Sequence, residues 1–131
     1  MNKDNTEIDL TNFSKEEEIA KFKGAQAKGW TVLIRLYMGS KKTPGGLIIP
    51  DESHDNEQYI SCSGLVVGKG KAVYLDKRYE ESGPWCEIGD WVVFPRHAGY
   101  KIFYNGLPLF VVKEDAIDIV VDDPSTVRRD K

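Results

Sequence analysis

Residues 101–112 read Lys-Ile-Phe-Tyr-Asn-Gly-Leu-Pro-Leu-Phe-Val-Val, and this stretch decides the fold class. Two short runs of aromatic and branched side chains, 101–104 and 109–112, lie on either side of Asn105-Gly106. An Asn-Gly pair readily adopts the backbone conformation that a tight β-hairpin turn requires. The stretch therefore predicts two antiparallel strands joined by a tight turn.

Similar strand-like runs occur before and after this hairpin. We expect further strands over residues 31–37, 64–68, 90–94 and 117–121, each bounded by glycines or polar residues. Short strands at regular spacing with turn residues between them are typical of a small antiparallel barrel or sandwich. The sequence therefore predicts an all-β domain.

Length and composition limit the function classes. The 131 residues suit one domain with a real core. A net charge of −3 gives no basic surface for nucleic acid. The sequence has no apolar run of membrane-spanning length and no signal-peptide pattern at its N-terminus, so we expect a cytoplasmic protein with no membrane partner. We expect its two cysteines, Cys62 and Cys86, to be reduced.

The two ends of the chain differ from the strand-rich part. Ser14 followed by Glu17 matches a helix capping box, and the next residues can form a short helix that ends at Gly24. Such a short helix is marginal in water by itself. We therefore expect residues 1–28 to be an N-terminal extension, partly helical or disordered, and residues 122–131 to be a polar tail.

A long polar stretch, about residues 39–59, contains an apolar run that the chain's own core explains poorly. Gly45-Gly46 precedes Leu47-Ile48-Ile49, and Pro50 follows them. The glycines free the backbone, and the proline stops a strand or helix from continuing. We interpret the stretch as a mobile loop that offers three aliphatic side chains to a hydrophobic groove on a partner. The alternative is a short strand that closes over this protein's own core.

The sequence shows no motif that carries chemistry. Residues 64–70 resemble a phosphate loop only superficially, because one residue is missing between the glycines and no Ser or Thr follows the lysine. His54 and His97 do not form zinc-ligand spacings with the two cysteines. We therefore expect no catalytic residue, no metal and no cofactor, and the chain is predicted not to be an enzyme.

Several motifs occur in an order that resembles the GroES-type co-chaperonin (chaperonin-10) family across about residues 29–121. The segments that carry the resemblance are Val32–Arg35, Gly45–Ile49, Ser63–Gly70, Ile88–Phe94 and Ala116–Val120. Each motif is weak by itself, and their shared order and spacing make the match strong.

The resemblance implies a small irregular GroES-like β-barrel, seven copies of which form a dome-shaped lid. Residues 39–59 would be the mobile loop and residues 70–84 the roof hairpin at the top of the dome. The first and last strands would pair between neighbouring subunits. The implied chaperonin-binding residues are Gly45, Gly46, Leu47, Ile48 and Ile49, and the implied subunit-interface residues are Val32, Leu33, Ile34, Ile117, Ile119 and Val121.

The function that the resemblance implies is that of a co-chaperonin. The ring would bind an ATP-loaded chaperonin of the GroEL type and enclose a folding substrate, while the partner binds and hydrolyses ATP. Three departures from the family pattern would suit a divergent member encoded by a bacteriophage and active in the host cytoplasm. They are the N-terminal extension, Ser63 in place of the usual basic residue, and the aromatic character of residues 100–104.

Two other functions compete with this interpretation. A structural adaptor or virion component would reuse the barrel and dock elsewhere through the loop, but retention of Leu47-Ile48-Ile49 argues against it. A fragment of a dehydrogenase with a GroES-like domain would need a zinc-ligand set and a following nucleotide-binding domain, and the sequence shows neither.

Overall fold

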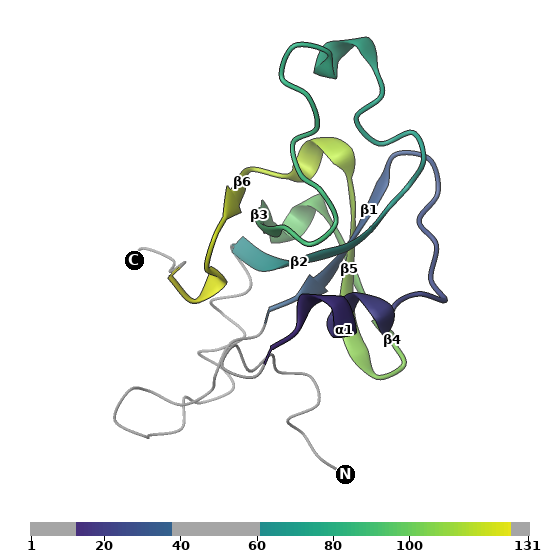
Figure 1. Cartoon of the computed structure of the whole chain (residues 1–131), viewed down its shortest axis with the longest axis vertical. Coiled ribbons are helices and arrows are strands. Elements are labelled where there is room, and N and C mark those ends of the chain that lie inside the picture. Colours follow the sequence, from purple (N-terminus) through teal and green to yellow (C-terminus); the bar gives the residue numbers. More distant parts are fainter. Residues whose placement is uncertain (1–12, 38–60, 127–131) are drawn as a thin grey trace.

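The computed structural model describes residues 13–37 and 61–126, which form a single antiparallel sheet with one short helix and a few 3₁₀ turns (Figure 1). The predicted all-β class is confirmed. The loop predicted at about 39–59 lies outside the described residues. The elements are α1 (Lys15–Ala20), β1 (Thr31–Leu36), β2 (Ser61–Lys69), η3 (Lys77–Tyr79), β3 (Trp91–Pro95), η4 (Arg96–Ala98), β4 (Gly99–Tyr104), β5 (Leu107–Lys113), η5 (Glu114–Ala116), β6 (Ile119–Val121) and η6 (Pro124–Thr126).

The strand order in the sheet is β4-β5-β1-β2-β3-β6, so β1 is an interior strand and β4 and β6 are the outer ones. The predicted hairpin is confirmed, because β4 pairs with β5 and Tyr104 lies opposite Leu107. Asn105 and Gly106 between them have φ angles of 52° and 79°. These left-handed values are the ones that a two-residue turn between twisted strands requires.

The sheet curls around a core instead of lying flat. The rings of Phe94 on β3 and Phe110 on β5 are 5.0 Å apart, although β1 and β2 separate these two strands in the sheet. In a flat sheet, three strand spacings would place them about 14 Å apart. A register shift between Leu33 and Ile34, where β1 pairs with β2, contributes to the bend. The enclosed core consists of Val32, Ile34, Leu36, Val66, Val73, Tyr74, Tyr79, Cys86, Val92, Phe94, Phe110, Val112 and Ile117.

The N-terminal segment buries the opposite face of the same sheet. Strand side chains alternate between faces, so β1 directs Val32 and Ile34 into the enclosed core and Leu33 to the other side. Phe22, which follows α1, is only 2% exposed within this second cluster. The extension therefore packs on the sheet of its own chain. The buried residues of this cluster are Phe22, Leu33, Leu65, Val67, Trp91, Leu107 and Leu109.

The helix in the extension begins where the sequence predicts. The side chain of Ser14 accepts a hydrogen bond from the backbone N–H of Glu17 at 3.3 Å, as an N-cap residue does. Glutamates in the first turn complement the positive end of the helix dipole. The helix is short and continues as turns to Gly24. Its position therefore depends on packing against the sheet.

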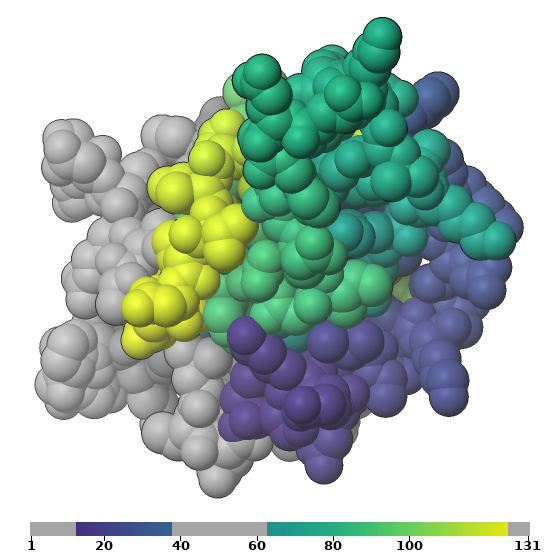
Figure 2. Space-filling model, turned by 45° about the horizontal axis from the view of Figure 1, so that its top comes forward, coloured from purple at the N-terminus to yellow at the C-terminus, as the bar shows by residue number. Residues whose placement is uncertain are grey.

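Residues 70–84 project from the body of the sheet as an excursion of turns (Figures 1 and 2). All of these residues are described, and none of them is in a strand, so this excursion differs from the paired-strand hairpin that the resemblance implies. A short 3₁₀ helix, η3, lies in its middle. The side chains of Tyr74 and Tyr79 turn back into the enclosed core. Side-chain anchoring therefore takes the place of strand pairing in this segment.

Candidate functional site

The predicted partner-binding residues, Gly45 to Ile49, lie outside the described residues, but the two points at which residues 38–60 leave and rejoin the sheet are described. The backbone N–H of Tyr37 donates to the carbonyl oxygen of Ser63 at 2.8 Å. One residue earlier, Leu36 pairs with Gly64 across β1 and β2. A side chain at position 64 would collide with the Arg35 carbonyl, so glycine allows this close approach. The chain therefore leaves the sheet and returns to it at one corner, which we call the loop base (Tyr37 and Ser63).

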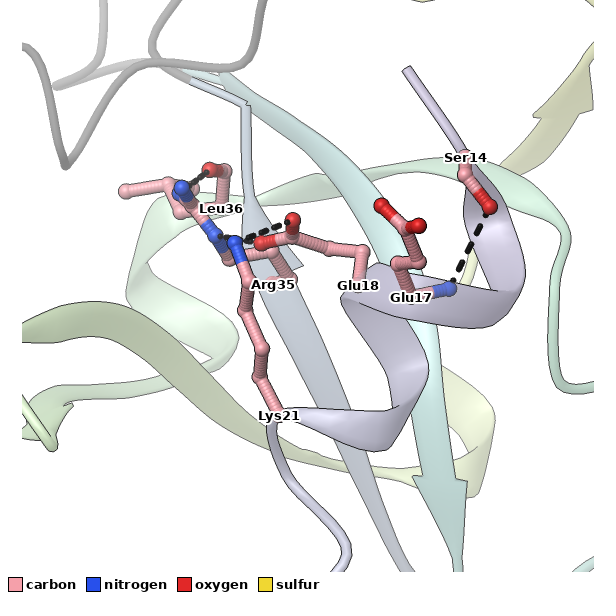
Figure 3. A network of polar contacts seen from close by, with 6 residues as sticks. All are labelled: Ser14, Glu17, Glu18, Lys21, Arg35 and Leu36. Atoms are coloured by element: carbon pink, nitrogen blue, oxygen red, sulfur yellow. Dashed lines mark hydrogen bonds and ion pairs between the residues drawn. The ribbon is translucent and has the colours of Figure 1, made fainter.

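A buried ion pair lies directly beside the loop base (Figure 3). Arg35 is 1% exposed, and its Nε donates to Oε2 of Glu18 on α1 at 2.7 Å. Its Nη1 donates to the carbonyl oxygen of Leu36 at 2.8 Å. Lys21 contacts the other carboxylate oxygen of Glu18 at 3.2 Å. The guanidinium group thus links the helix to the last residue of β1.

The sequence contains a signal for this pair that motif and spacing patterns do not capture. Arg35 interrupts an otherwise apolar strand. A charge buried in a strand that is covered on both faces needs an opposite charge close by. Removing one partner of such a buried pair typically costs about 3–5 kcal/mol, because the other charge remains desolvated. Glu18 carries no comparable signal, because glutamates on a short helix are ordinarily solvated.

An aromatic cluster forms a second contact between the N-terminal segment and the loop base. Trp91 on β3 is 4% exposed. Its ring centroid lies 5.3 Å from that of Phe13 and 5.9 Å from that of Tyr37. Tilted and edge-on arrangements at these distances are favourable for aromatic pairs. Trp91 therefore contacts both Phe13, which comes just before the N-cap of α1, and Tyr37 at the loop base.

The C-terminal strand β6 is a candidate surface for subunit contacts. It pairs with β3 on one side, and the described residues supply no strand on its other side. Ile119 is 54% exposed and Val120 is 44% exposed. Of the other interface residues that the resemblance implies on this side, Val121 is half-buried and Ile117 is buried in the enclosed core. An apolar outer strand with a free edge is suited to pairing with another chain.

The position of β1 differs from the one that the resemblance implies. Residues 31–34 were expected to pair with residues 117–121 of a neighbouring subunit. In the structure, β1 pairs with β5 on one side and with β2 on the other, and both partners are in the same chain. Val32, Leu33 and Ile34 are all buried. Both edges of β1 are therefore paired within the chain, and a role for its residues at a subunit interface stays a prediction.

The described residues offer little for catalysis or metal binding. Burial raises the pKa of the Cys86 thiol and so disfavours the reactive thiolate. Cys86 is a free thiol and lies 3.7 Å from the hydroxyl group of Tyr74. Within residues 13–37 and 61–126, no group of three His, Cys, Asp or Glu side chains could hold a metal ion. In the same part of the chain, no helix is both long and apolar enough to cross a membrane.

Comparison with known proteins identifies a family that matches most of the chain. The family described as "Chaperonin 10 Kd subunit" matches residues 25–121. The chain is 31% identical over 93 residues to a protein named co-chaperonin GroES from Geobacillus stearothermophilus, covering 71% of this chain and 94% of the relative. A protein of the same name from Aquifex aeolicus is 34% identical over 96 residues, covering 73% of this chain and 75% of the relative. The family match begins after α1 and ends at β6.

Proposed function

The chain belongs to the chaperonin 10 family, and we propose that it acts as a lid that closes an ATP-loaded chaperonin of the GroEL type. The observation that carries the proposal is the extent of the family match, which includes all six strands of the sheet. The co-chaperonin names of relatives that match across most of their own length support it. In this role the ring encloses a folding substrate within the partner's chamber.

The proposed contact with the chaperonin is the aliphatic run Leu47-Ile48-Ile49, made accessible by Gly45-Gly46. Burial of each aliphatic side chain contributes roughly 1.5–3 kcal/mol. Ordering the backbone around them costs about 1–2 kcal/mol per residue. These terms largely offset each other, so one copy of the segment binds weakly. Several copies on one ring bind firmly, because each further contact is effectively intramolecular after the first has formed.

The proposed ring uses the outer edge of β6, where residues 13–37 and 61–126 supply no strand. An unpaired edge with exposed Ile119 and Val120 is an aggregation risk in a monomer, and assembly into a closed ring covers it. The edge that β6 meets on the next subunit belongs to an element other than β1, because β1 is already paired on both sides. The resemblance implies seven copies in the ring.

The proposed mechanism assigns ATP binding and hydrolysis to the chaperonin and no cofactor to this chain. A lid that is held by many weak contacts can dissociate whenever the partner's conformation makes each contact slightly less favourable. The cycle of the partner therefore controls binding and release. This mechanism requires the protein to be in the cytoplasm with its chaperonin.

Native mass spectrometry tests the proposal directly. We expect a ring of identical chains when the protein is alone, and a complex with a GroEL-type chaperonin that forms when ATP is present. A refolding assay with a substrate that strictly requires a lid should then show activity. A folded protein that neither forms a ring nor binds the ATP-loaded chaperonin would contradict the proposal and favour an adaptor role.

A further inference from the structure

The N-terminal segment lies outside the family match, yet its side chains make contacts that lead to the loop base. The match begins at residue 25, whereas α1 ends at Ala20. Glu18 is the buried charged residue of this helix, and its partner Arg35 lies within the matched region. The ion pair thus connects Glu18, which lies outside the family match, with Arg35, which lies inside it.

The polar contacts run from the helix to the end of β1. Glu18 holds the Arg35 guanidinium at 2.7 Å, and the same guanidinium donates to the carbonyl oxygen of Leu36 at 2.8 Å. Leu36 is the last residue of β1, and the next residue, Tyr37, bonds through its N–H to Ser63. Charge-assisted hydrogen bonds with good geometry hold their groups more firmly than neutral ones. The helix therefore restrains the backbone from which residues 38–60 depart.

The aromatic contacts reach the same corner from the other end of the helix. Phe13 precedes α1 and contacts Trp91, which in turn contacts Tyr37. Two chemically different contacts from one N-terminal segment thus converge on the loop base. A segment that merely covered apolar surface would not need a buried ion pair, because desolvating two charges is costly and an apolar pair of similar volume is often as stable.

We propose that Glu18 is a positioning residue for chaperonin binding. Through Arg35 and Leu36 it fixes the loop base, and Phe13 assists through Trp91 and Tyr37. This inference rests on the proposed function and deepens it. A restrained base leaves less backbone freedom to be lost at Leu36 and Tyr37 when the adjoining segment binds a partner, so each contact is stronger. Because the effect is repeated at every subunit of the ring, a small local change becomes a large change in lid affinity.

The test compares Glu18→Gln with Glu17→Gln, the same substitution at an exposed neighbour on α1. Binding of each ring to a GroEL-type chaperonin is measured with ATP, well below the melting temperature. Glu18→Gln should weaken binding about tenfold or more, and Glu17→Gln should leave it unchanged. Hydrogen exchange gives a second readout: in Glu18→Gln the Tyr37 amide should exchange faster, whereas the Val66 amide, which bonds to Asp90, should not.

Loss of stability alone is controlled with Glu114→Ala. Glu114 anchors the 70–84 excursion, which lies at the opposite end of the molecule from α1 in both views (Figures 1 and 2). This variant should melt earlier yet keep the chaperonin affinity of the unmodified protein. If Glu18→Gln fails to fold, Phe13→Ala gives the same two readouts, because it removes only the aromatic contact.

The outcomes separate this inference from the proposed function. An unmodified ring that does not bind the ATP-loaded chaperonin contradicts the proposed function. An unmodified ring that binds, together with a Glu18→Gln ring that binds equally well or has an unchanged Tyr37 amide, overturns the positioning role alone. Equal weakening by Glu18→Gln and Glu114→Ala would also overturn it, because general destabilisation would then explain the effect.

Discussion

The carboxylate of Glu114 accepts a hydrogen bond from the backbone N–H of Tyr74 at 2.7 Å, although the two residues are 40 positions apart. The hydroxyl group of Tyr74 returns a bond to the carbonyl oxygen of Glu114 at 2.7 Å. The other carboxylate oxygen of Glu114 accepts from Arg78 at 3.1 Å. One buried side chain after β5 thus anchors the excursion that follows β2.

Replacing Glu114 with alanine should destabilise the fold by about 2–3 kcal/mol, because the buried Tyr74 N–H then has no acceptor. Arg78→Ala removes the other side of the same ion pair, but the Arg78 side chain is 58% exposed. Its loss should therefore cost less than the loss of Glu114, because the Glu114 carboxylate keeps the bond from the Tyr74 N–H. Urea unfolding of both variants at one protein concentration measures the difference. Equal costs would show that Glu114 does not act through the backbone of Tyr74.

Gly106→Ala should destabilise the β4–β5 hairpin by about 1–2 kcal/mol, because residue 106 has a φ angle of 79° and a Cβ atom is strained there. Gly106→Asn should cost less, since asparagine tolerates the left-handed region better than alanine does. Thermal melting of the two variants provides the comparison. A larger loss for asparagine than for alanine would contradict the backbone explanation.

Ile48→Asp should abolish chaperonin binding while it leaves folding and ring assembly nearly unchanged. The substitution places a charge where the proposed contact requires an aliphatic side chain, and burying an unpaired charge is strongly unfavourable. Avidity repeats this penalty around the ring. Thermal melting and chaperonin-dependent refolding should be measured on the same samples. A variant that melts much earlier would indicate a core role for Ile48, and one that still supports refolding would contradict the lid function.

Ile119→Lys should weaken ring assembly without unfolding the chain. Ile119 is 54% exposed at the free edge of β6, so the lysine remains solvated in a single subunit and becomes unfavourable only against a neighbour. Leu75→Lys is the matched control, because Leu75 is 75% exposed and lies on the 70–84 excursion. Native mass spectrometry should show smaller species for Ile119→Lys. Intact rings for both variants would remove β6 from the interface.

Raising the pH above about 9 should reduce stability through the buried Tyr74 and Cys86 side chains. Burial raises the pKa of both groups in the folded chain. Their contribution to stability is fully present below the unfolded pKa values, about 10 and 8.5. It is lost as the pH rises toward the folded values, because only the unfolded chain then releases the protons.

Urea unfolding at about pH 7, 9 and 10.5 tests this dependence across the unfolded pKa values. Tyr74→Phe should be less stable throughout, because it lacks the bond to the Glu114 carbonyl. Its stability should nevertheless fall less steeply between the two higher pH values. The same slope in both proteins would contradict a role for the Tyr74 hydroxyl.

Features encoded by adjacent residues could be predicted from the sequence. Asn105-Gly106 specified the hairpin, and Ser14 with Glu17 specified the start of α1. In both cases the relevant interaction joins residues at most three positions apart, so the pattern is visible in a short window. The run Leu47-Ile48-Ile49 also stands out locally. Its role as a binding segment stays a prediction, because these residues lie outside the described part of the chain.

The tertiary structure alone decided which distant residues meet. It placed β1 between β2 and β5, so Val32, Leu33 and Ile34 became core residues, and it left β6 with no described strand on its outer side. It also paired Arg35 with Glu18 and Tyr74 with Glu114. Turn and cap preferences depend on residues a few positions apart, so they can be recognised in a short stretch of sequence. Strand order and the partners of buried charges depend on how both faces of the sheet are covered, which only the folded chain determines.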